Sequence, residues 1–513
     1  MPDILPIRVQ NILRRGKPTV RKYKTRRYKQ NRLANESAII RKMIHAYKLG
    51  GRNIILDIAS GAVHSVDDAA YDVICVYEDM REHEPPAGSG ELKTLAKRIT
   101  RHIEKKHPKL SEQDVLMILV DIELLISKGE LFTKDSFSDA LDGGKIGGGM
   151  ANSFAPIKAL CLNVAHTCNM SCAYCFAKGG FENSTEQKLM PQETANKALE
   201  FLVSNSGGRK TLDIDFFGGE PLLNWQVCKD TVAYARRLEK ETDKKFRFTL
   251  TTNGLLIDDD VISFANREFH NVVFSLDGRP DIHDKMRTVP GGGGSYGEIL
   301  PKIKKFVKER REKGYYIRGT FTKENIDFSN DILHIADIGF GEISLEPVVT
   351  KHKNPLGFTM DDLTGLLGEY DKLALEMQRR KAIDKGFNFY HFMLDLTSGP
   401  CIHKRIAGCG VGTEYLAVTP NGELYPCHQF IGDDKMKMGD VWQGVTNRKL
   451  LSEFAVCGIY SKEECSCCWA RFYCSGGCAA NAYHDTGSIS GIYKFGCELF
   501  KRRIENAIML QVP

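Results

Sequence analysis

Three cysteines fall within eight residues of the stretch HTCNMSCAYCFA, residues 166–177. Cys168, Cys172 and Cys175 have the spacing Cys-x3-Cys-x2-Cys, and no fourth cysteine lies nearby. A structural zinc site is closed by four ligands, and an all-cysteine [4Fe-4S] cluster also takes four. A close-set triple therefore leaves one coordination position open, and an open position predicts chemistry at the metal.

The remaining cysteines also indicate metal or redox ligands. The chain has 16 cysteines, of which ten lie between Cys401 and Cys497. No secretory signal is evident, and the most apolar run, residues 115–126, is too short to span a bilayer and is interrupted by Asp121 and Glu123. We therefore predict a cytoplasmic protein without a membrane partner, in which disulfides would not persist. The isolated residues Cys75, Cys161 and Cys228 are expected to be ordinary buried small side chains.

The net charge of +6 comes from one end of the chain. Residues 1–42 contain thirteen Lys or Arg and two acidic residues, so the remainder carries 58 basic and 63 acidic groups, a net charge of −5. The basic segment could be a nucleic-acid arm. We interpret it as a disordered extension, because only two tyrosines are interleaved with its charges. A nucleic-acid partner is not expected.

The pattern of apolar residues divides the rest into five parts. Residues 43–134 read as short strands and three helices, a small winged-helix-like module, and Ser111 with Asp114 has capping-box spacing. Residues 135–155 are a glycine-rich linker. Strands and helices then alternate over 156–350, with strands expected at 159–165, 211–217, 246–252, 272–276, 315–322 and 342–348. Six strands favour a partial barrel over a closed eight-stranded one. Bridging helices (351–400) and a cysteine-rich domain (401–513) follow.

Polar motifs stand directly after successive strands. The second strand ends in Gly218, Gly219 and Glu220, the third in Asn253, and the fourth in Ser275 and Asp277. Two glycines let a ligand approach the backbone, and a glutamate can receive a cationic amine. Each motif alone could be a strand-ending turn. Because the carboxyl ends of parallel strands meet at one edge, their repetition predicts a single site.

These residues resemble the radical S-adenosylmethionine (SAM) superfamily. The resemblance covers residues ~156–350 and implies a partial (β/α)6 barrel. It implies that Cys168, Cys172 and Cys175 hold a [4Fe-4S] cluster whose open iron is chelated by SAM, which would explain the missing fourth ligand. By the same resemblance, Gly218, Gly219 and Glu220 lie along the methionyl amine, and Asn253, Ser275 and Asp277 line the rest of the pocket. Arg287 is a candidate for the carboxylate, and Asp277 or His428 could act as a general base.

The C-terminal cysteines form a second constellation, with Cys-x2-Cys-x5-Cys-x3-Cys spacing at its centre. A zinc ribbon needs four ligands and not seven. The seven cysteines resemble the SPASM extension of radical enzymes that modify peptides. That resemblance implies two auxiliary [4Fe-4S] clusters, making three in all. It assigns Cys465, Cys468, Cys474 and Cys497 to one cluster, and Cys409, Cys427 and Cys478 to the other.

The second of these auxiliary clusters again lacks a ligand. Cys401 could complete it, or a substrate thiolate could bind there and be activated, because a coordinated thiol is deprotonated. Cys457 and Cys467 fit no ligand pattern and are expected to be structural.

The chain after Met43 is similar to the SCIFF maturases, which crosslink small cysteine-rich precursor peptides. The similarity implies a thioether-forming enzyme in which one low-potential electron, from a donor such as ferredoxin or flavodoxin, cleaves SAM to a radical that abstracts hydrogen from the acceptor. It also implies that the winged-helix-like module captures the precursor's leader as an added strand. An anaerobic sulfatase-maturing enzyme is the nearest alternative, and an iron-sulfur electron-transfer or nucleic-acid-binding protein is an alternative from another class.

Overall fold

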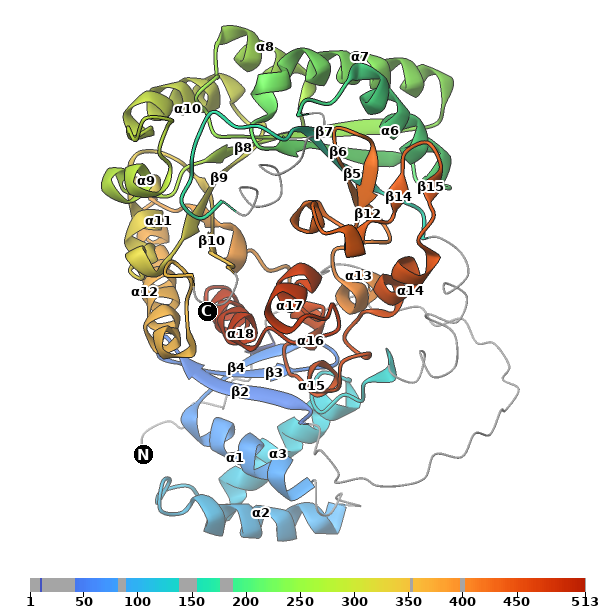
Figure 1. Ribbon diagram of the computed structural model, residues 1–513. Helices are drawn as coiled ribbons and strands as arrows, with labels where there is room; N and C mark the ends of the chain where they lie inside the picture. The colour runs from blue at the N-terminus through green and yellow to red at the C-terminus, as the bar shows by residue number, and fades with distance from the viewer. Residues whose placement is uncertain are drawn as a thin grey trace, which may run out of the picture.

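The computed structural model describes residues 10–11, 42–81, 89–137, 155–175, 188–350, 354–396 and 402–512. Figure 1 shows an N-terminal module at the bottom, a large curved sheet with outer helices at the top, and the C-terminal region between them. Cys401 lies outside the described residues, as do most of the predicted extension and linker.

The N-terminal module consists of a small antiparallel sheet and three helices. Its strands are β2 (Ile44–Leu49), β3 (Arg52–Asp57) and β4 (Val63–Val66), and its helices are α1 (Asp68–Arg81), α2 (Ser89–Ile103) and α3 (Glu112–Ser127). The module has its own hydrophobic core, which includes Ile55, Val73, Ile99 and Leu119. The predicted capping box at Ser111 and Asp114 is present.

A fourth strand lies at the edge of this sheet. Strand β1 (Gln10–Asn11) pairs antiparallel with β4, and the strand order is β1-β4-β3-β2. Within the segment predicted to be a disordered extension, the structure thus describes this two-residue strand. The physical reason is that an edge strand presents unpaired N–H and C=O groups, which an extended segment of the same chain can satisfy.

Six parallel strands form the central sheet. They are β5 (Ala159–Ala165), β6 (Thr211–Gly218), β7 (Lys245–Thr252), β8 (Asn271–Ser275), β9 (Gly314–Phe321) and β10 (Glu342–Pro347). Each strand bound lies within one residue of its predicted position. Helices α6 (Gln192–Asn205), α7 (Trp225–Glu241), α8 (Asp259–Glu268), α10 (Tyr296–Arg310) and α11 (Phe328–Asp337) cover the outer face (Figure 1).

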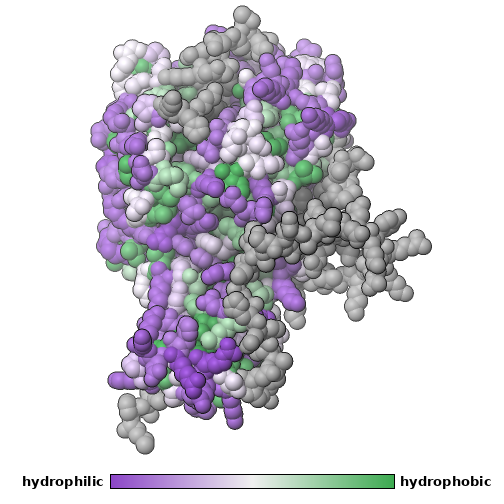
Figure 2. All heavy atoms as spheres, turned by 60° about the horizontal axis from the view of Figure 1, so that its bottom comes forward, coloured by the Kyte–Doolittle hydropathy of each residue, from purple (hydrophilic) through white to green (hydrophobic). Residues whose placement is uncertain are grey.

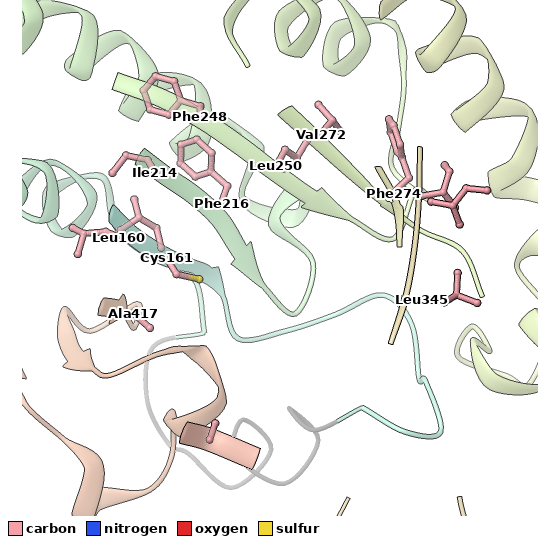
Figure 3. Packing of buried hydrophobic residues seen from close by; sticks show 14 of the residues in the cluster. Leu160, Cys161, Ile214, Phe216, Phe248, Leu250, Val272, Phe274, Leu345 and Ala417 are labelled. Atoms are coloured by element: carbon pink, nitrogen blue, oxygen red, sulfur yellow. The ribbon is translucent and has the colours of Figure 1, made fainter. Parts of the chain in front are cut away.

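The main hydrophobic core lies between these strands and their outer helices. Alternate residues of β6 and β7 point into it, among them Ile214, Phe216, Phe248 and Leu250, all fully buried. Figure 3 shows these side chains with those of the neighbouring strands. The residues between them face the concave inner side of the curved sheet (Figure 1), called here the lumen. Cys161 and Cys228 are buried as predicted, whereas Cys75 is only half-buried.

The sheet does not end with the barrel strands. It contains 11 strands, because β12 (Tyr415–Val418) pairs in parallel with β5 and continues through β13 (Glu423–Tyr425), β14 (Gly439–Asp440) and β15 (Gly444–Val445). Strand β11 (Asn388–Phe389) extends the other edge beside β10. Of the predicted bridging helices, the structure has α12 (Leu363–Lys381). The cysteine-rich region is therefore built onto the barrel sheet itself.

The N-terminal module rests on the cysteine-rich region. The His45 ring on β2 stacks on Trp469 with centroids 3.7 Å apart, and its Nε2 lies 3.0 Å from Glu505 of α18 (Lys494–Met509). Asp135 forms an ion pair with Arg471 at 3.1 Å. The first residues of the predicted linker are thus fixed against the C-terminal region, because a buried ion pair holds them there. No helix in the described part of the chain is long and apolar enough to cross a membrane.

Candidate active site at the strand ends

The loop with the first three cysteines follows β5 and is held by backbone hydrogen bonds. The Ser171 N–H donates to the Thr288 carbonyl at 2.7 Å, and the Ala173 N–H donates to the Met286 carbonyl at 2.8 Å. The Met170 N–H approaches the Cys168 sulfur at 3.4 Å. The segment after α9 (Pro280–Met286) thereby forms one wall of the cysteine loop.

A buried triad of side chains joins this loop to two other strands. The Tyr174 hydroxyl donates to Asp277 Oδ2 at 2.6 Å, and Arg287 Nε lies 3.0 Å from the same oxygen. The Arg287 guanidinium also lies over the Tyr174 ring, 5.5 Å from its centroid. The other oxygen, Asp277 Oδ1, accepts from the Thr320 N–H at 2.9 Å. Asp277 is therefore fully engaged within the protein. Arg287, predicted as a candidate for the SAM carboxylate, is thus paired with Asp277, and Tyr174 is a positioning partner that the sequence analysis did not identify.

The two glycines after β6 permit a close approach of backbones. A Cβ on Gly218 would lie 2.2 Å from the Ala165 carbonyl oxygen, and one on Gly219 would lie 2.2 Å from that of Thr167. Gly218 also has φ of +130°, which side chains rarely allow. The Glu220 N–H donates to the Thr167 carbonyl at 3.0 Å. The β6 turn is thus pressed directly against the residue before Cys168.

Glu220 is completely buried and ties the second and third strands together. Its Oε2 accepts from the Asn253 N–H at 2.7 Å, and its Oε1 accepts from the Thr252 hydroxyl at 2.8 Å and the Leu222 N–H at 3.0 Å. Burial raises the pKa of this carboxyl to about 7, against these hydrogen bonds, which lower it. Glu220 therefore positions the turn, and its oxygens are already occupied by protein donors.

Asn253 and Ser275 stand at the ends of β7 and β8, the next two strands of the sheet after β6. Asn253 Nδ2 donates to Asn169 at 2.8 Å and lies 3.6 Å from the Cys168 sulfur. Ser275 is half-buried at the end of β8, facing the lumen. The structure thus brings together the residues that end β5, β6, β7 and β8, as the strand-end motifs predict.

The three thiols are close enough to influence one another. The pKa of Cys168 is raised to about 11, first by burial and then by the nearby charges of Glu220, Cys172 and Cys175. Thiols held together in a site that disfavours their ionised forms suit ligation by a cationic metal cluster, which stabilises thiolates. The residues present therefore fit a [4Fe-4S] cluster. No group of His, Cys, Asp or Glu among the described residues is arranged around a single metal ion.

Four C-terminal cysteines gather around one cavity. The pKa of Cys474 is raised to about 12, first by burial and then by Cys497, Cys465 and Cys468. A cavity of about 110 Å³ lies beside them, and its lining includes Lys501 and Cys478. The donor set and the space fit a second [4Fe-4S] cluster with Lys501 as a nearby compensating charge.

The other three C-terminal cysteines form a separate group. The pKa of Cys427 is raised to about 12, by burial first and then by Cys478 and Cys409. The pKa of Cys478 is also raised, with contributions from Cys409 and Glu346. Cys409 and Cys478 are exposed, whereas Cys427 is half-buried. Of the two cysteines expected to be structural, Cys457 donates to the Ile489 carbonyl at 3.3 Å.

His428 follows Cys427 and reaches the barrel. Its ring packs against Phe217 of β6, with centroids 4.7 Å apart. Burial lowers its pKa to about 4, and the charge of Arg318 lowers it further. The imidazole is therefore neutral at pH 7 and could accept a proton, which keeps the general-base hypothesis for His428 open. Asp277, by contrast, has both oxygens engaged.

Asp215 on β6 offers a test of the lumen's electrostatics. Burial and, secondarily, Asp213 raise its pKa to about 6, against about 4 in an unfolded chain. The folded state binds this proton more tightly, so stability is greatest below pH 4 and falls as the pH rises to 6. Asp215→Asn should raise the free energy of unfolding by about 2 kcal/mol at pH 8, after allowance for partial exposure, and leave it unchanged at pH 4. Thermal unfolding at the two pH values measures this, and an equal effect at both would contradict it.

Comparisons with known proteins agree with this geometry. Residues 162–328 match the Radical SAM superfamily. The radical SAM cyclopropyl synthase TigE of Paramaledivibacter caminithermalis is 22% identical, over 69% of this chain and 74% of its own. The cysteine-type anaerobic sulfatase-maturating enzyme of Clostridium perfringens is 24% identical, over 63% of this chain and 89% of its own.

A solved structure of anSMEcpe with bound AdoMet has the same fold. It superposes with a TM-score of 0.57 at 20% sequence identity, and the match covers 98% of that chain but 70% of this one. A further structure contains anSMEcpe with AdoMet and the Cp18Cys peptide. A substantial part of the present chain therefore has no counterpart in anSMEcpe.

Proposed function

Because the chain contains a radical SAM domain homologous to SPASM-type peptide-modifying enzymes, we propose that it forms thioether crosslinks in a ribosomally made, cysteine-rich peptide of the SCIFF type. The observation that carries this proposal is the separate group of Cys409, Cys427 and Cys478. Three thiols leave one position of a [4Fe-4S] cluster for a substrate cysteine, whose thiol would ionise on binding. A crosslink would remove the thiol proton, one hydrogen atom from the acceptor carbon and one electron, which an auxiliary cluster held by these cysteines would accept.

Different residues of this chain would bind the first cluster, bind SAM and position the cysteine loop. Cys168, Cys172 and Cys175 hold the first cluster, and the backbone at Gly218 and Gly219 lies along the SAM methionine. When bound, the cluster and SAM supply the electron and the radical that removes hydrogen from an unactivated carbon. A ferredoxin or flavodoxin is the proposed electron donor. The contacts of Asp277 with Tyr174 and Arg287 hold the cysteine loop in a fixed position beside the proposed SAM pocket.

A second auxiliary cluster completes the proposed set of three. Its ligands would be the four cysteines that line the cavity, Cys465, Cys468, Cys474 and Cys497. Trp469 follows Cys468 directly and stacks on His45 of the N-terminal module. The proposed cluster therefore lies next to the surface on which that module rests.

We propose the N-terminal module as the binding site for the precursor's leader. The edge of β4 is competent for strand addition, because it pairs with Gln10–Asn11 of the same chain. Beside it, His64 Nε2 lies 2.9 Å from the Glu130 carbonyl, so the end of α3 adjoins this edge. An incoming leader would compete with β1 for the same hydrogen bonds.

Helix α3 presents an apolar face on the surface of the same module. Met117, Val120 and Leu124 recur at three- and four-residue spacing and are 55%, 47% and 50% exposed. Figure 2, in which this module is turned toward the reader, shows hydrophobic side chains among its hydrophilic surface. An extended leader with alternating apolar residues would cover this face while pairing with β4.

Sulfatase maturation is the alternative supported by the relatives from Clostridium perfringens. A sulfatase-maturing enzyme would not require a leader-binding module, and the match to anSMEcpe leaves 30% of this chain uncovered. The two functions differ in the fate of sulfur. A thioether retains the cysteine sulfur in the peptide, whereas conversion of cysteine to an aldehyde loses it.

The decisive experiment is the mass of a cysteine-rich precursor peptide of the SCIFF type, after anaerobic co-expression with the enzyme and alkylation of free thiols. We expect the loss of two hydrogens for each thiol that escapes alkylation. Cys168→Ala should abolish this change, because the first cluster loses one of three protein ligands. Cys75→Ala is the matched control, since Cys75 is half-buried in the N-terminal module, away from the cysteine groups.

An unmodified and fully alkylated peptide would reject the thioether assignment for this substrate. Loss of sulfur from a cysteine would favour the sulfatase-maturing alternative. Salt-dependent binding of nucleic acid without release of deoxyadenosine would favour the non-enzymatic one.

A further inference from the structure

One arginine in the lumen has a charge that the protein does not neutralise. Arg318 lies on β9, where Ile317 and Gly319 are buried toward the helices and Arg318 is exposed on the opposite face. Strand register places it directly between Ser275 of β8 and Ser344 of β10. Paired residues of neighbouring strands point to the same face, so all three line the lumen.

The other lumen cations near Arg318 are already paired. Arg287 is committed to Asp277, and Arg503 of α18 lies 3.1 Å from Glu346 and donates to the Tyr370 hydroxyl. The Arg318 carbonyl accepts from the Leu276 N–H at 3.0 Å, but within the described residues its side chain forms neither a hydrogen bond nor an ion pair. Its guanidinium therefore faces the lumen with its donors available.

The positive charge of Arg318 lowers the pKa of two neighbouring side chains, Glu346 and His428. Burial favours the neutral form of Glu346, but His391, Arg503 and Arg318 outweigh it and lower its pKa to about 2. Burial lowers the pKa of His391 itself to about 3, so this imidazole is neutral at pH 7 and the two guanidiniums are the effective charges. Glu346 forms its ion pair with Arg503, so the Arg318 guanidinium acts on Glu346 only through space and has no ion-pair partner among the described residues.

The position of Arg318 is intermediate between the two proposed reaction partners. Ser275, on one side, belongs to the proposed SAM pocket. On the other side, Glu346 of β10 contacts Arg503 on α18 of the cysteine-rich region at 3.1 Å. Protein surrounds Glu346, yet 39% of its side chain is exposed, so it borders open space within the lumen. A peptide held between the radical source and an open auxiliary cluster would pass this point.

We propose that Arg318 is a substrate-specificity residue that binds a carboxylate of the peptide and so selects the segment presented for crosslinking. This inference rests on the proposed function. A guanidinium binds a carboxylate through two parallel hydrogen bonds, and it does so most strongly where little water competes. The carboxylate could also be that of SAM, and the experiment separates the two sources.

The test compares Arg318→Gln with Arg318→Lys in the full-length, cluster-loaded enzyme. Arg237→Gln, an arginine on the outer helix α7, is the matched control. The probes are SAM and the cysteine-rich precursor, used with its natural acidic residues and with those of its core replaced by the corresponding amides. We expect Arg318→Gln to raise the KM for the natural precursor 10- to 100-fold. The KM for SAM and peptide-independent deoxyadenosine release should stay within about twofold, and lysine should restore part of the loss.

The amide precursor provides the second measurement. With wild-type enzyme it should show the same rise in KM, and Arg318→Gln should add nothing further, because the two changes remove one interaction. A matching rise in the KM for SAM, seen also without peptide, would assign Arg318 to the SAM carboxylate and overturn the proposal. Unchanged KM values for both probes would overturn it as well.

Failure of the proposed function would be recognised separately. In that case wild-type enzyme leaves the precursor unmodified while it still cleaves SAM. Binding of the fluorescently labelled core peptide to the wild type and to Arg318→Gln then decides the matter. A loss of affinity confined to Arg318→Gln supports the specificity role, and equal affinities reject it.

Discussion

Replacement of Gly219 by alanine is expected to abolish SAM cleavage, with a loss of at least about 100-fold. The new Cβ would lie 2.2 Å from the Thr167 carbonyl oxygen and 3.2 Å from the Cβ of Cys168. Backbone atoms cannot yield as a flexible side chain can, so the cysteine loop must move away from the β6 turn. That movement breaks the Glu220–Thr167 hydrogen bond and displaces a proposed cluster ligand.

The measurement is iron and sulfide content per chain together with deoxyadenosine release. Gly219→Ala should lose the iron of one cluster and retain that bound by the C-terminal cysteines, because those lie on other elements. Gly208→Ala is the matched control, since its Cβ would meet nothing within 4 Å. Full iron content and normal cleavage in Gly219→Ala would show that the turn does not position the cysteine loop.

A double substitution on α3, Val120→Glu with Leu124→Glu, should weaken binding of the precursor's leader 10- to 100-fold. Both side chains are about half exposed, at 47% and 50%, so the fold loses little. Covering each with a leader residue would contribute about 1 kcal/mol, and a buried glutamate adds a desolvation cost. The measurement is the dissociation constant of a labelled leader peptide.

Val456→Glu on α14 (Arg448–Val456) is the control for this pair, because Val456 is 63% exposed and lies outside the N-terminal module. Modification of a core peptide supplied without its leader should be equal in all variants. Unaltered leader binding by the double variant would remove α3 from the proposed site. Reduced activity on the leaderless peptide would point instead to damage of the catalytic region.

The relation between α3 and β4 also bears on the basic extension. Strand β1 occupies the same edge that a leader would use, so both cannot pair with β4 at once. The leader-binding constant above is therefore an apparent value that includes displacement of β1. Comparison with a chain that starts at Lys42 would give the intrinsic value.

Local patterns determined much of this protein from sequence alone. The strands β5–β10 were predictable to within a residue, because their apolar residues recur at a two-residue period or form short buried runs bounded by turns. The spacing of Cys168, Cys172 and Cys175 predicted one close group of thiols, whereas the division of the C-terminal cysteines into two groups came only from the resemblance to SPASM domains. The Ser111–Asp114 capping box was also readable, because it joins residues three apart.

Tertiary structure alone decided the contacts between distant residues. Tyr174 meets Asp277 across 103 residues, Glu346 meets Arg503 across 157, and His45 meets Glu505 across 460. Tertiary structure also decided that β12 pairs with β5, which joins the cysteine-rich region to the barrel. It likewise decided that Arg318 lies in the lumen without an ion-pair partner among the described residues. The physical reason is that burial and pairing of a polar group depend on which strands and helices become neighbours. Local periodicity specifies each element and its faces, but not the partner that each face meets.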